Sequence, residues 1–504
     1  MNLKNHVLWA ACLVGCALPA QAAMYQGADS PISAYYIGGR AESATVLNVK
    51  NYRVTQAPRQ NLEQANMAQR HLLVAASAYQ PNVRPVRLAQ ITRIKQNDKL
   101  ALKPAADTAP PGRLISQSFF GMHIHRADST TVWPNAAFGS YRAWDANVLW
   151  ANLEPSKGRW DFSRLDKLVN LSTNHGVSVL ITFGGTPAWA SARPAEDGAY
   201  GKGTAAEPRD FKDWENYVRT VATRYRGRVK MYELANEPYF SELDADLEQR
   251  FFSGSVHTMV AMAASAKKIL KEIDPEIALY SPGFDNRPNR LDLFLKSGGG
   301  QYIDGVAVHL YTSNPKPEFM LDSLKAFKSV MVKHGIKNMP IICTEIGYDE
   351  KWIPKREMLL PFKDLLAAYV ARAHVLGAAA GLDRLYWYSW DGLGGGMAEP
   401  NSRVLNKVGI AYMQVMRWLK GANIQGCKTA DNNLWTCELN LGTRAAWVVW
   451  NTEGSKKWSV PPDWHALQYE TLDARLLKLD SNAVITVGPS PVLIQSDGKL
   501  WSAY

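Results

Sequence analysis

The chain of 504 residues is long enough for two or three domains, and 46% hydrophobic with 20% charged residues is ordinary for a globular protein. Its formal net charge of +11 favours acidic partners such as an anionic glycan, nucleic acid or membrane surface, and it equally fits general solubility. However, no run of Lys and Arg predicts a nucleic-acid-binding arm, and no segment beyond the leader is apolar enough to predict a transmembrane helix.

Residues 1–22 have the pattern of a secretory signal peptide. Val7–Pro19 is mostly apolar but too short to span a bilayer, and residues 20–22, Ala-Gln-Ala, fit a cleavage site. We therefore expect an exported bacterial protein, either periplasmic or secreted. An alternative is a lipoprotein box at residues 13–16, which would leave Cys16 lipidated and anchor the protein at the outer membrane.

Three cysteines remain once the leader is removed. Cys427 and Cys437 flank turn-forming residues 431–433, so we expect a hairpin that brings the two cysteines together as a disulfide. An exported protein permits such a bond. Cys343 lies in an apolar run and is predicted to be an inert buried thiol.

Residues 23–113 form an N-terminal extension of unknown role, with the weakest pattern of the chain. A helix is predicted over Leu62–Ser77 and a strand over Val86–Ile94. The extension ends in a Pro- and Ala-rich stretch at residues 103–112 that is typical of a linker.

From residue 114 to residue 420, apolar strand-like runs alternate with amphipathic helical runs. This alternation predicts an α/β fold, and eight such units predict a (β/α)8 TIM barrel. A doubly wound sheet would need a Gly-rich phosphate loop after the first strand, and residues 121–125 are not one. The expected strands are Leu114–His123, Ser140–Trp144, Val177–Phe183, Val229–Leu234, Ile277–Ser281, Ile303–Val308, Pro340–Thr344 and Leu385–Ser389. The expected helices are Phe162–His175, Phe211–Tyr225, Val256–Ile273, Pro317–His334, Pro361–Gly377 and Gly409–Leu419.

Residues 421–504 change pattern to short strands separated by turn residues, which predicts a small antiparallel, β-sandwich-like domain. Four of its tryptophans, Trp447, Trp450, Trp458 and Trp464, fit a hydrophobic core better than the alternative of a carbohydrate-binding surface. The expected strands are Leu434–Leu439, Ala445–Asn451, Leu467–Thr471, Ala474–Leu479, Ala483–Val487 and Val492–Gln495.

Two glutamates stand at the ends of expected barrel strands, Glu237 after the fourth strand and Glu345 after the seventh. In a closed barrel these ends open onto one face, where the active sites of such barrels lie. Two carboxyl groups on either side of one bond are what glycoside cleavage requires, one as proton donor and one as nucleophile or base. The pair therefore predicts a glycosidase.

Other polar side chains occupy neighbouring strand ends. Asn236 is expected to bind the 2-hydroxyl of the sugar being cleaved, and Tyr311 and Arg142 are expected to keep Glu345 ionised. His309 and His123 are predicted to bind sugar hydroxyls, and Trp390 to offer a flat face to a sugar ring. Each residue alone fits a packing role, and only their joint occurrence points to a site.

In these residues the chain resembles the clan A retaining glycoside hydrolases, most closely family 39 and its exopolysaccharide-processing relatives, with family 5 next. The resemblance covers residues 114–418 and rests on residues 141–142, 153–162, 186–190, 236–238, 309–311 and 344–345, with Trp150 and residues 387–390. It implies that Glu237 is the acid/base, Glu345 the nucleophile, and a bacterial extracellular polysaccharide or oligosaccharide the substrate. Trp150, Trp189 and Trp387 join the substrate-binding residues on the same ground. The positive net charge of the chain adds the expectation that this glycan is acidic.

Three alternatives stay open. A transglycosylase would use the same residues, and a non-catalytic carbohydrate-binding barrel would not need both glutamates. A metal-dependent hydrolase would need several ligands at a suitable spacing, and His123 with His125 is the one close pair. We therefore expect neither a metal nor a cofactor.

Overall fold

The computed structural model describes residues 114–244, 251–312, 314, 316–353, 355, 358, 360–392, 396–399, 402–430 and 433–496. The leader at residues 1–22, the alternative lipidation site Cys16 and the extension at residues 23–113, with its expected helix and strand, lie outside these residues. Predictions about them therefore stay predictions.

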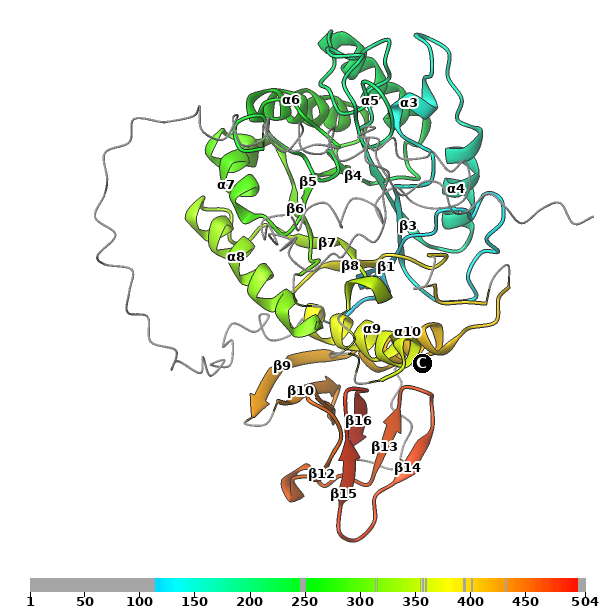
Figure 1. Cartoon of the computed structure of the whole chain (residues 1–504), viewed down its shortest axis with the longest axis vertical. Coiled ribbons are helices and arrows are strands. Elements are labelled where there is room, and N and C mark those ends of the chain that lie inside the picture. The colour runs from blue at the N-terminus through cyan, green and yellow to red at the C-terminus, as the bar shows by residue number, and fades with distance from the viewer. Residues whose placement is uncertain are drawn as a thin grey trace, which may run out of the picture. The chain divides into compact units, whose positions relative to one another are not determined.

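Eight parallel strands close into a barrel in which each strand pairs with its neighbours in chain order and the last pairs with the first (Figure 1). Helices surround the barrel on the outside, so the strands are buried on both faces. The predicted TIM barrel is confirmed. Its strands are β1 (Phe120–Met122), β2 (Ser140–Ala143), β3 (Ser178–Thr182), β4 (Met231–Glu233), β5 (Ala278–Phe284), β6 (Gly305–His309), β7 (Ile341–Ile346) and β8 (Arg384–Trp387).

The helices begin where the sequence supplies capping side chains. Asp210, Ser255 and Asn406 each accept a hydrogen bond from a backbone N–H of the helix that follows. Two helices, α3 and α7, were not predicted, because four and nine residues give little periodic signal. The helices are α3 (Trp150–Leu153), α4 (Ser163–Asn174), α5 (Phe211–Arg224), α6 (Val256–Ile273), α7 (Pro288–Lys296), α8 (Met320–Lys333), α9 (Phe362–Ala379) and α10 (Lys407–Leu419).

The first barrel strand is shorter than the predicted Leu114–His123. One turn of 3-10 helix, Gln117–Phe119, precedes β1. The backbone of Ile115 accepts from Gly421 N at 2.8 Å and donates to Ala422 O at 2.9 Å, so this segment pairs with the chain after α10. The predicted strand is wrong at its amino end because these partners lie outside the barrel.

The barrel interior is layered, and its chemistry changes along the strands. One buried layer is apolar and is made of Leu180, Met231, Tyr280, Ala307, Ile342 and Tyr386. Nearer the carboxyl ends, the buried residues are polar: Arg142, Thr182, Glu233, His309 and Thr344. A barrel of this kind carries its functional groups on this polar side.

After α10 the chain forms a six-stranded antiparallel sheet and a separate two-stranded ribbon. Cys427 lies directly opposite Cys437 on neighbouring strands, and the predicted disulfide joins them. The strand β9 is the first arm of the hairpin expected around residues 431–433, whereas β12 was not among the expected strands. The sheet runs in the order β14 (Leu476–Lys478), β13 (Gln468–Thr471), β16 (Val492–Gln495), β11 (Arg444–Asn451), β10 (Leu434–Leu441) and β9 (Asn423–Ala430), and the ribbon pairs β12 (Lys456–Ser459) with β15 (Val484–Val487).

Tryptophans pack within this sheet, and hydrogen bonds of Trp450 and the buried Glu470 attach it to the barrel. Trp447 stacks on Trp464 at 4.3 Å within a hydrophobic cluster, which supports a core role over a sugar-binding surface. On the barrel side, Trp450 Nε1 donates to Glu318 at 2.7 Å. Glu470 accepts from Gln414 and from Trp418 on α10, and these bonds join the sheet to the barrel.

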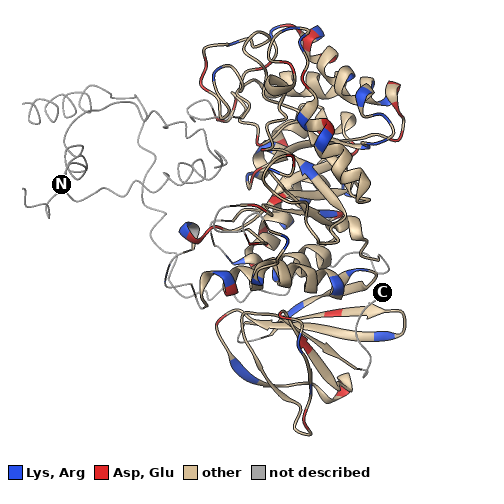
Figure 2. Ribbon diagram, turned by 90° about the vertical axis from the view of Figure 1, so that its right-hand side faces the viewer, with Lys and Arg blue, Asp and Glu red and all other residues tan. Residues whose placement is uncertain are grey.

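Charged residues of both signs are interspersed over the described part of the chain (Figure 2). Within that part, no helix combines the length and apolar character needed to cross a bilayer.

Candidate active site

Arg142 on β2 stands at the centre of the polar layer. It is fully buried, and it donates through Nε to Glu233 Oε2 at 2.8 Å, through Nη1 to Glu345 Oε1 at 2.6 Å and through Nη2 to Asn236 Oδ1 at 2.8 Å. A buried cation needs such partners, because burial of an unpaired charge is costly. The expected contact between Arg142 and Glu345 is confirmed. Thr182 completes the group by donating to Glu233 at 2.6 Å.

Glu237 follows β4 by four residues and is held by the neighbouring strand. Its backbone N–H donates to Gly283 O at 2.9 Å, and the residue before it, Asn236, forms a parallel bridge with Gly283. The φ angle of Glu237 is +33°, a conformation that costs on the order of 1–3 kcal/mol for a residue other than glycine. This strain places a carboxyl group, 5% exposed, at the barrel mouth.

Glu345 lies within β7 and is completely buried. Burial raises the pKa of Glu345 to about 7, although His309 and Arg142 act to lower it. Tyr311 donates to Glu345 Oε2 at 3.3 Å, as expected from the sequence, and burial keeps the pKa of this phenol well above its usual value. Glu345 therefore has two donors that favour its ionised form.

His309 was predicted to bind a sugar hydroxyl, and in the structure it also lies between Glu237 and Glu345. Its Nδ1 is 2.7 Å from Glu237 Oε1 and 3.6 Å from Glu345 Oε2. Burial lowers the pKa of His309, so the ring is neutral at neutral pH. The sequence located His309 at the site but did not predict its contact with Glu237.

Several polar atoms at the barrel mouth are buried without a protein partner. Asn236 Nδ2, His123 Nδ1, His125 Nε2 and Trp144 Nε1 are among them. Because a buried polar atom without a hydrogen bond is costly, such atoms point to a ligand or to water. The predicted sugar-binding roles of Asn236 and His123 are compatible with these positions. The other ring nitrogen of His123 is 2.8 Å from the Thr344 carbonyl oxygen.

Two predicted sugar-binding tryptophans are core residues. Trp150 is fully buried, stacks on Tyr217 at 4.7 Å and donates to Glu154 at 2.8 Å. Trp387 is 1% exposed and packs against His374. Neither ring has a free face for a sugar, so these two assignments are corrected.

The other two tryptophans stay predictions. Trp390, which follows β8, is 2% exposed, and its backbone N–H donates to the backbone oxygen of His123 at 2.9 Å. Trp189 is partly buried and donates to Glu154 O at 2.8 Å, with Lys157 Nζ 5.6 Å from its ring centre. None of these contacts involves Glu237 or Glu345.

The structure adds residues that sequence reasoning missed. Asp145, near Glu345, accepts hydrogen bonds from Tyr388 at 2.9 Å and from Tyr200. The ring of Tyr388 lies 5.0 Å from that of His123. Glu233 is the other addition, through its contacts with Arg142.

Glu237, His309 and Glu345 each offer a ligand atom, and these atoms all lie within 4.8 Å of one another. Carboxylate oxygens with one imidazole nitrogen are a donor set that divalent cations accept. The expected absence of a metal is therefore a matter for experiment. The predicted alternative, His123 with His125, is not part of this group.

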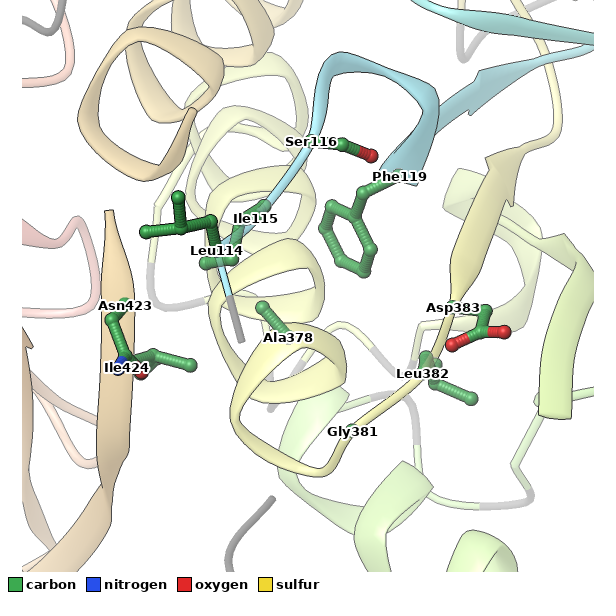
Figure 3. A pocket seen from close by; sticks show the side chains of 10 residues that line it. All are labelled: Leu114, Ile115, Ser116, Phe119, Ala378, Gly381, Leu382, Asp383, Asn423 and Ile424. Atoms are coloured by element: carbon green, nitrogen blue, oxygen red, sulfur yellow. The ribbon is translucent and has the colours of Figure 1, made fainter. Parts of the chain in front are cut away.

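A pocket also lies at the opposite end of the strands, before β1 and β8 (Figure 3). Its walls are mainly apolar and backbone atoms, and Asp383 is its one ionisable side chain. It lacks the paired carboxyl groups found at the barrel mouth. The lining residues are Leu114, Ile115, Ser116, Phe119, Ala378, Gly381, Leu382, Asp383, Asn423 and Ile424.

Comparison with known proteins agrees with this geometry. The family model described as Glycosyl hydrolase family 10 matches residues 136–346. The chain is 27% identical over 165 residues to an endo-1,4-beta-xylanase of Agaricus bisporus, which covers 32% of this chain and 44% of that protein. It is 23% identical over 242 residues to a beta-xylosidase of Geobacillus stearothermophilus, covering 42% and 45%. The chain thus spans less than half the length of these relatives.

Solved structures share the architecture. A family 39 glycoside hydrolase from Bacteroides cellulosilyticus WH2 has a TM-score of 0.58 at 18% identity, covering 77% of this chain and 83% of that one. A GH39 beta-xylosidase from Caulobacter crescentus has a TM-score of 0.52 at 15% identity, covering 77% and 98%. A GH30 endoxylanase from Clostridium papyrosolvens C71 has a TM-score of 0.51 at 13% identity, covering 77% and 97%.

The barrel fold and the family-model match over residues 136–346 support the predicted likeness to the clan A glycoside hydrolases. The fold is like that of solved structures from families 39 and 30.

Proposed function

We propose that the protein hydrolyses glycosidic bonds by double displacement, with Glu237 as acid/base and Glu345 as nucleophile. The separation of the two carboxyl groups carries the proposal, because an oxygen of each lies within 4.8 Å of the other. Direct attack uses carboxyl groups roughly 5–5.5 Å apart, whereas inversion needs roughly 6.5–9.5 Å to admit a water. The short separation supports retention of the anomeric configuration.

The surroundings of the two carboxyl groups support this division of roles. Arg142 and Tyr311 both donate to Glu345, which favours a negative charge there. Glu237 faces the neutral ring of His309. Two carboxyl groups this close hold one proton between them, and it is more stable on Glu237.

The reaction then has two halves. Glu345 attacks the anomeric carbon while Glu237 gives its proton to the departing oxygen, and a covalent glycosyl-enzyme forms. In the second half, Glu237 takes a proton from a water molecule that attacks the same carbon. Asn236 is held by Arg142 through its oxygen, so its amide nitrogen is left to bind the sugar 2-hydroxyl.

The charges of the described site favour a neutral sugar between the glutamates. Asp145 adds a third carboxyl group near Glu345, and Arg142 is already occupied by three partners. A carboxylate on the bound sugar ring would therefore be repelled. Because relatives are named xylanase and xylosidase, we propose a neutral β-linked oligosaccharide or polysaccharide. Acidic groups elsewhere on the glycan, and a bacterial exopolysaccharide as target, stay predictions.

We also propose that the protein works after export. The disulfide between Cys427 and Cys437 supports this location, because such bonds persist in oxidising compartments.

A screen tests the proposal. Wild type and Glu345→Ala are compared on xylans, plant glucans and bacterial exopolysaccharides, each with and without a chelator. We expect release of reducing sugar by wild type alone, on at least one glycan, at a rate the chelator does not change. Equal release by Glu345→Ala would contradict the assignment, and a loss of activity with the chelator would identify a metal-dependent reaction.

A further inference from the structure

Asp145, which lies just after β2, joins two segments across the barrel mouth. Its carboxylate accepts hydrogen bonds from the phenol of Tyr388, at 2.9 Å, and from the phenol of Tyr200. Tyr388 follows β8, and Tyr200 belongs to the long segment between β3 and α5. The φ angle of Asp145 is +56°, in the left-handed region that aspartate tolerates better than most side chains. One carboxylate thereby links the ends of β8 and β3 across β1 and β2, which lie between them in the barrel.

Aromatic rings extend this link into a wall. The ring of Tyr200 lies 5.5 Å from that of Trp144 and 5.6 Å from that of Phe251, which follows β4 in the chain. The ring of Tyr388 lies 4.8 Å from that of His125, which follows β1. Segments from different parts of the sequence therefore meet in one structure. We call it the aromatic wall and define it by Trp144, Asp145, Tyr200, Phe251 and Tyr388.

The two glutamates define the direction in which a bound glycan runs. Glu237 is held on the side of β5 and β6, through the bond of its N–H to Gly283 and the contact of its carboxyl group with His309. The hydrogen-bonded part of the aromatic wall rises from β8, β2 and β3, on the other side of the barrel. The acid protonates the oxygen that leaves, so the departing part of the glycan lies toward Glu237. The sugar ring that Glu345 attacks therefore extends toward the wall.

The exposure of the two glutamates bears on the same question. An enzyme that cuts inside a long glycan must hold sugars on both sides of its carboxyl groups, which requires a groove that runs past them. Glu237 is only 5% exposed, and Glu345 is completely buried. The described mouth therefore fits the end of a glycan chain better than its middle.

We propose that the enzyme acts on chain ends, because the aromatic wall limits the side of the glycan beyond Glu345 to a single sugar. The protein then releases one monosaccharide at a time from the non-reducing end. The inference rests on the proposed function, and it narrows the substrate class to β-linked glycans with an accessible, unsubstituted non-reducing end. Tyr200 and Tyr388 are specificity-determining residues in this account, since Asp145 holds both phenols in place.

Product analysis with the full chain tests the proposal. Short oligosaccharides of each glycan in the screen are labelled at the reducing end with aminobenzamide and incubated with wild type and Glu345→Ala. We expect wild type alone to shorten the labelled chains by one sugar at a time, with free monosaccharide as the other product. Labelled fragments of several lengths appearing together from the start, or release of a disaccharide, would overturn the inference and leave the proposed function intact. No cleavage of any glycan would instead reject the proposed function.

A second measurement tests the wall itself, with oligosaccharides methylated on the 4-hydroxyl of the non-reducing terminal sugar. Wild type and Tyr200→Phe, which keeps the ring, should discriminate against the methyl group by about 10- to 100-fold in kcat/KM, and Tyr200→Ala should lose most of this discrimination. Phe251→Ala carries the same expectation should Tyr200→Ala fail to fold.

Tyr302→Ala is the matched control, because Tyr302 is partly buried just before β6, at the opposite end of the strands. It should discriminate like wild type. Unchanged discrimination in folded Tyr200→Ala and Phe251→Ala would contradict the role of the aromatic wall.

Discussion

Arg142 Nη1 lies 2.6 Å from Glu345 Oε1, and both side chains are completely closed off from solvent. The same guanidinium bonds Glu233, so one cation neutralises two buried carboxylates at the centre of the barrel mouth. Much of the stability and the chemistry of the site depends on this one contact.

Replacing Arg142 with Gln should destabilise the fold and nearly abolish turnover. Two buried carboxylates would lose their shared cation, and the removal of one partner of a buried ion pair costs about 3–5 kcal/mol. Urea unfolding measures this change in the free energy of unfolding. Arg228→Gln is a matched control, because exposed Arg228 bonds Asn170 at the surface and should change stability by less than about 0.5 kcal/mol. Equal effects of the two variants would contradict the role of Arg142.

Glu345→Gln should lower kcat by about 10⁴-fold or more while the protein stays folded, because the nucleophile is lost. Steady-state kinetics on the glycan found by screening provides the measurement. Exposed Glu272, paired with Arg219 on the outside of the barrel, supplies the control Glu272→Gln, which should behave like wild type. Substantial turnover by Glu345→Gln would refute the nucleophile assignment.

Glu237→Gln should be selective among substrates. General acid catalysis contributes about 10²- to 10⁴-fold, so we expect a loss of that size on natural glycans. The dinitrophenolate group of a dinitrophenyl glycoside leaves without being protonated. The first step of cleavage should therefore be nearly unaffected for these substrates. Pre-steady-state release of dinitrophenol separates this step from the hydrolysis that follows. A uniform loss for all leaving groups would argue against Glu237 as the acid.

The pH dependence of the enzyme's activity follows from the raised pKa of Glu345, which is about 7 against an ordinary value of 4.5. Because the carboxyl pair shares one proton, we assign this value to the loss of that proton from the pair. The value of kcat/KM should fall as pH rises through about 7, and Glu237→Gln should lack this alkaline limb. A wild-type profile that stays flat up to pH 9 would contradict the shared proton.

The raised pKa of Glu345 also makes the free energy of unfolding depend on pH. A carboxyl group whose pKa is higher in the folded state stabilises the fold below pH 4.5, and this contribution is lost as pH rises toward 7. Glu345→Gln should remove this part of the decline. Denaturant unfolding at several pH values compares the two proteins, and parallel curves would count against a proton shared by Glu237 and Glu345.

The sequence was sufficient for the fold and the glutamate pair. The alternation of strand-like and helical runs predicts the barrel, and carboxyl groups at two strand ends must meet on its one functional face. Contacts with Glu345 were also predictable for Tyr311 and Arg142, because Tyr311 follows the adjacent strand β6 and Arg142 lies on β2, whose end opens onto the same barrel mouth. The helix Val256–Ile273 was predicted to the residue, since its amphipathic pattern is long.

Other parts of the site depend on tertiary packing. Trp150 and Trp387 lie near strand ends, but the sequence does not state which ring faces are covered by Tyr217 or His374. Glu233 had a usable signal, because an acidic residue within an apolar strand requires a buried cation.

The stereochemistry of the first-formed product tests the central claim most directly. Proton NMR during the first minutes of hydrolysis distinguishes the two anomers before mutarotation mixes them. The short separation of Glu237 and Glu345 predicts a product with the same anomeric configuration as the substrate. A product of inverted configuration would contradict direct attack by Glu345.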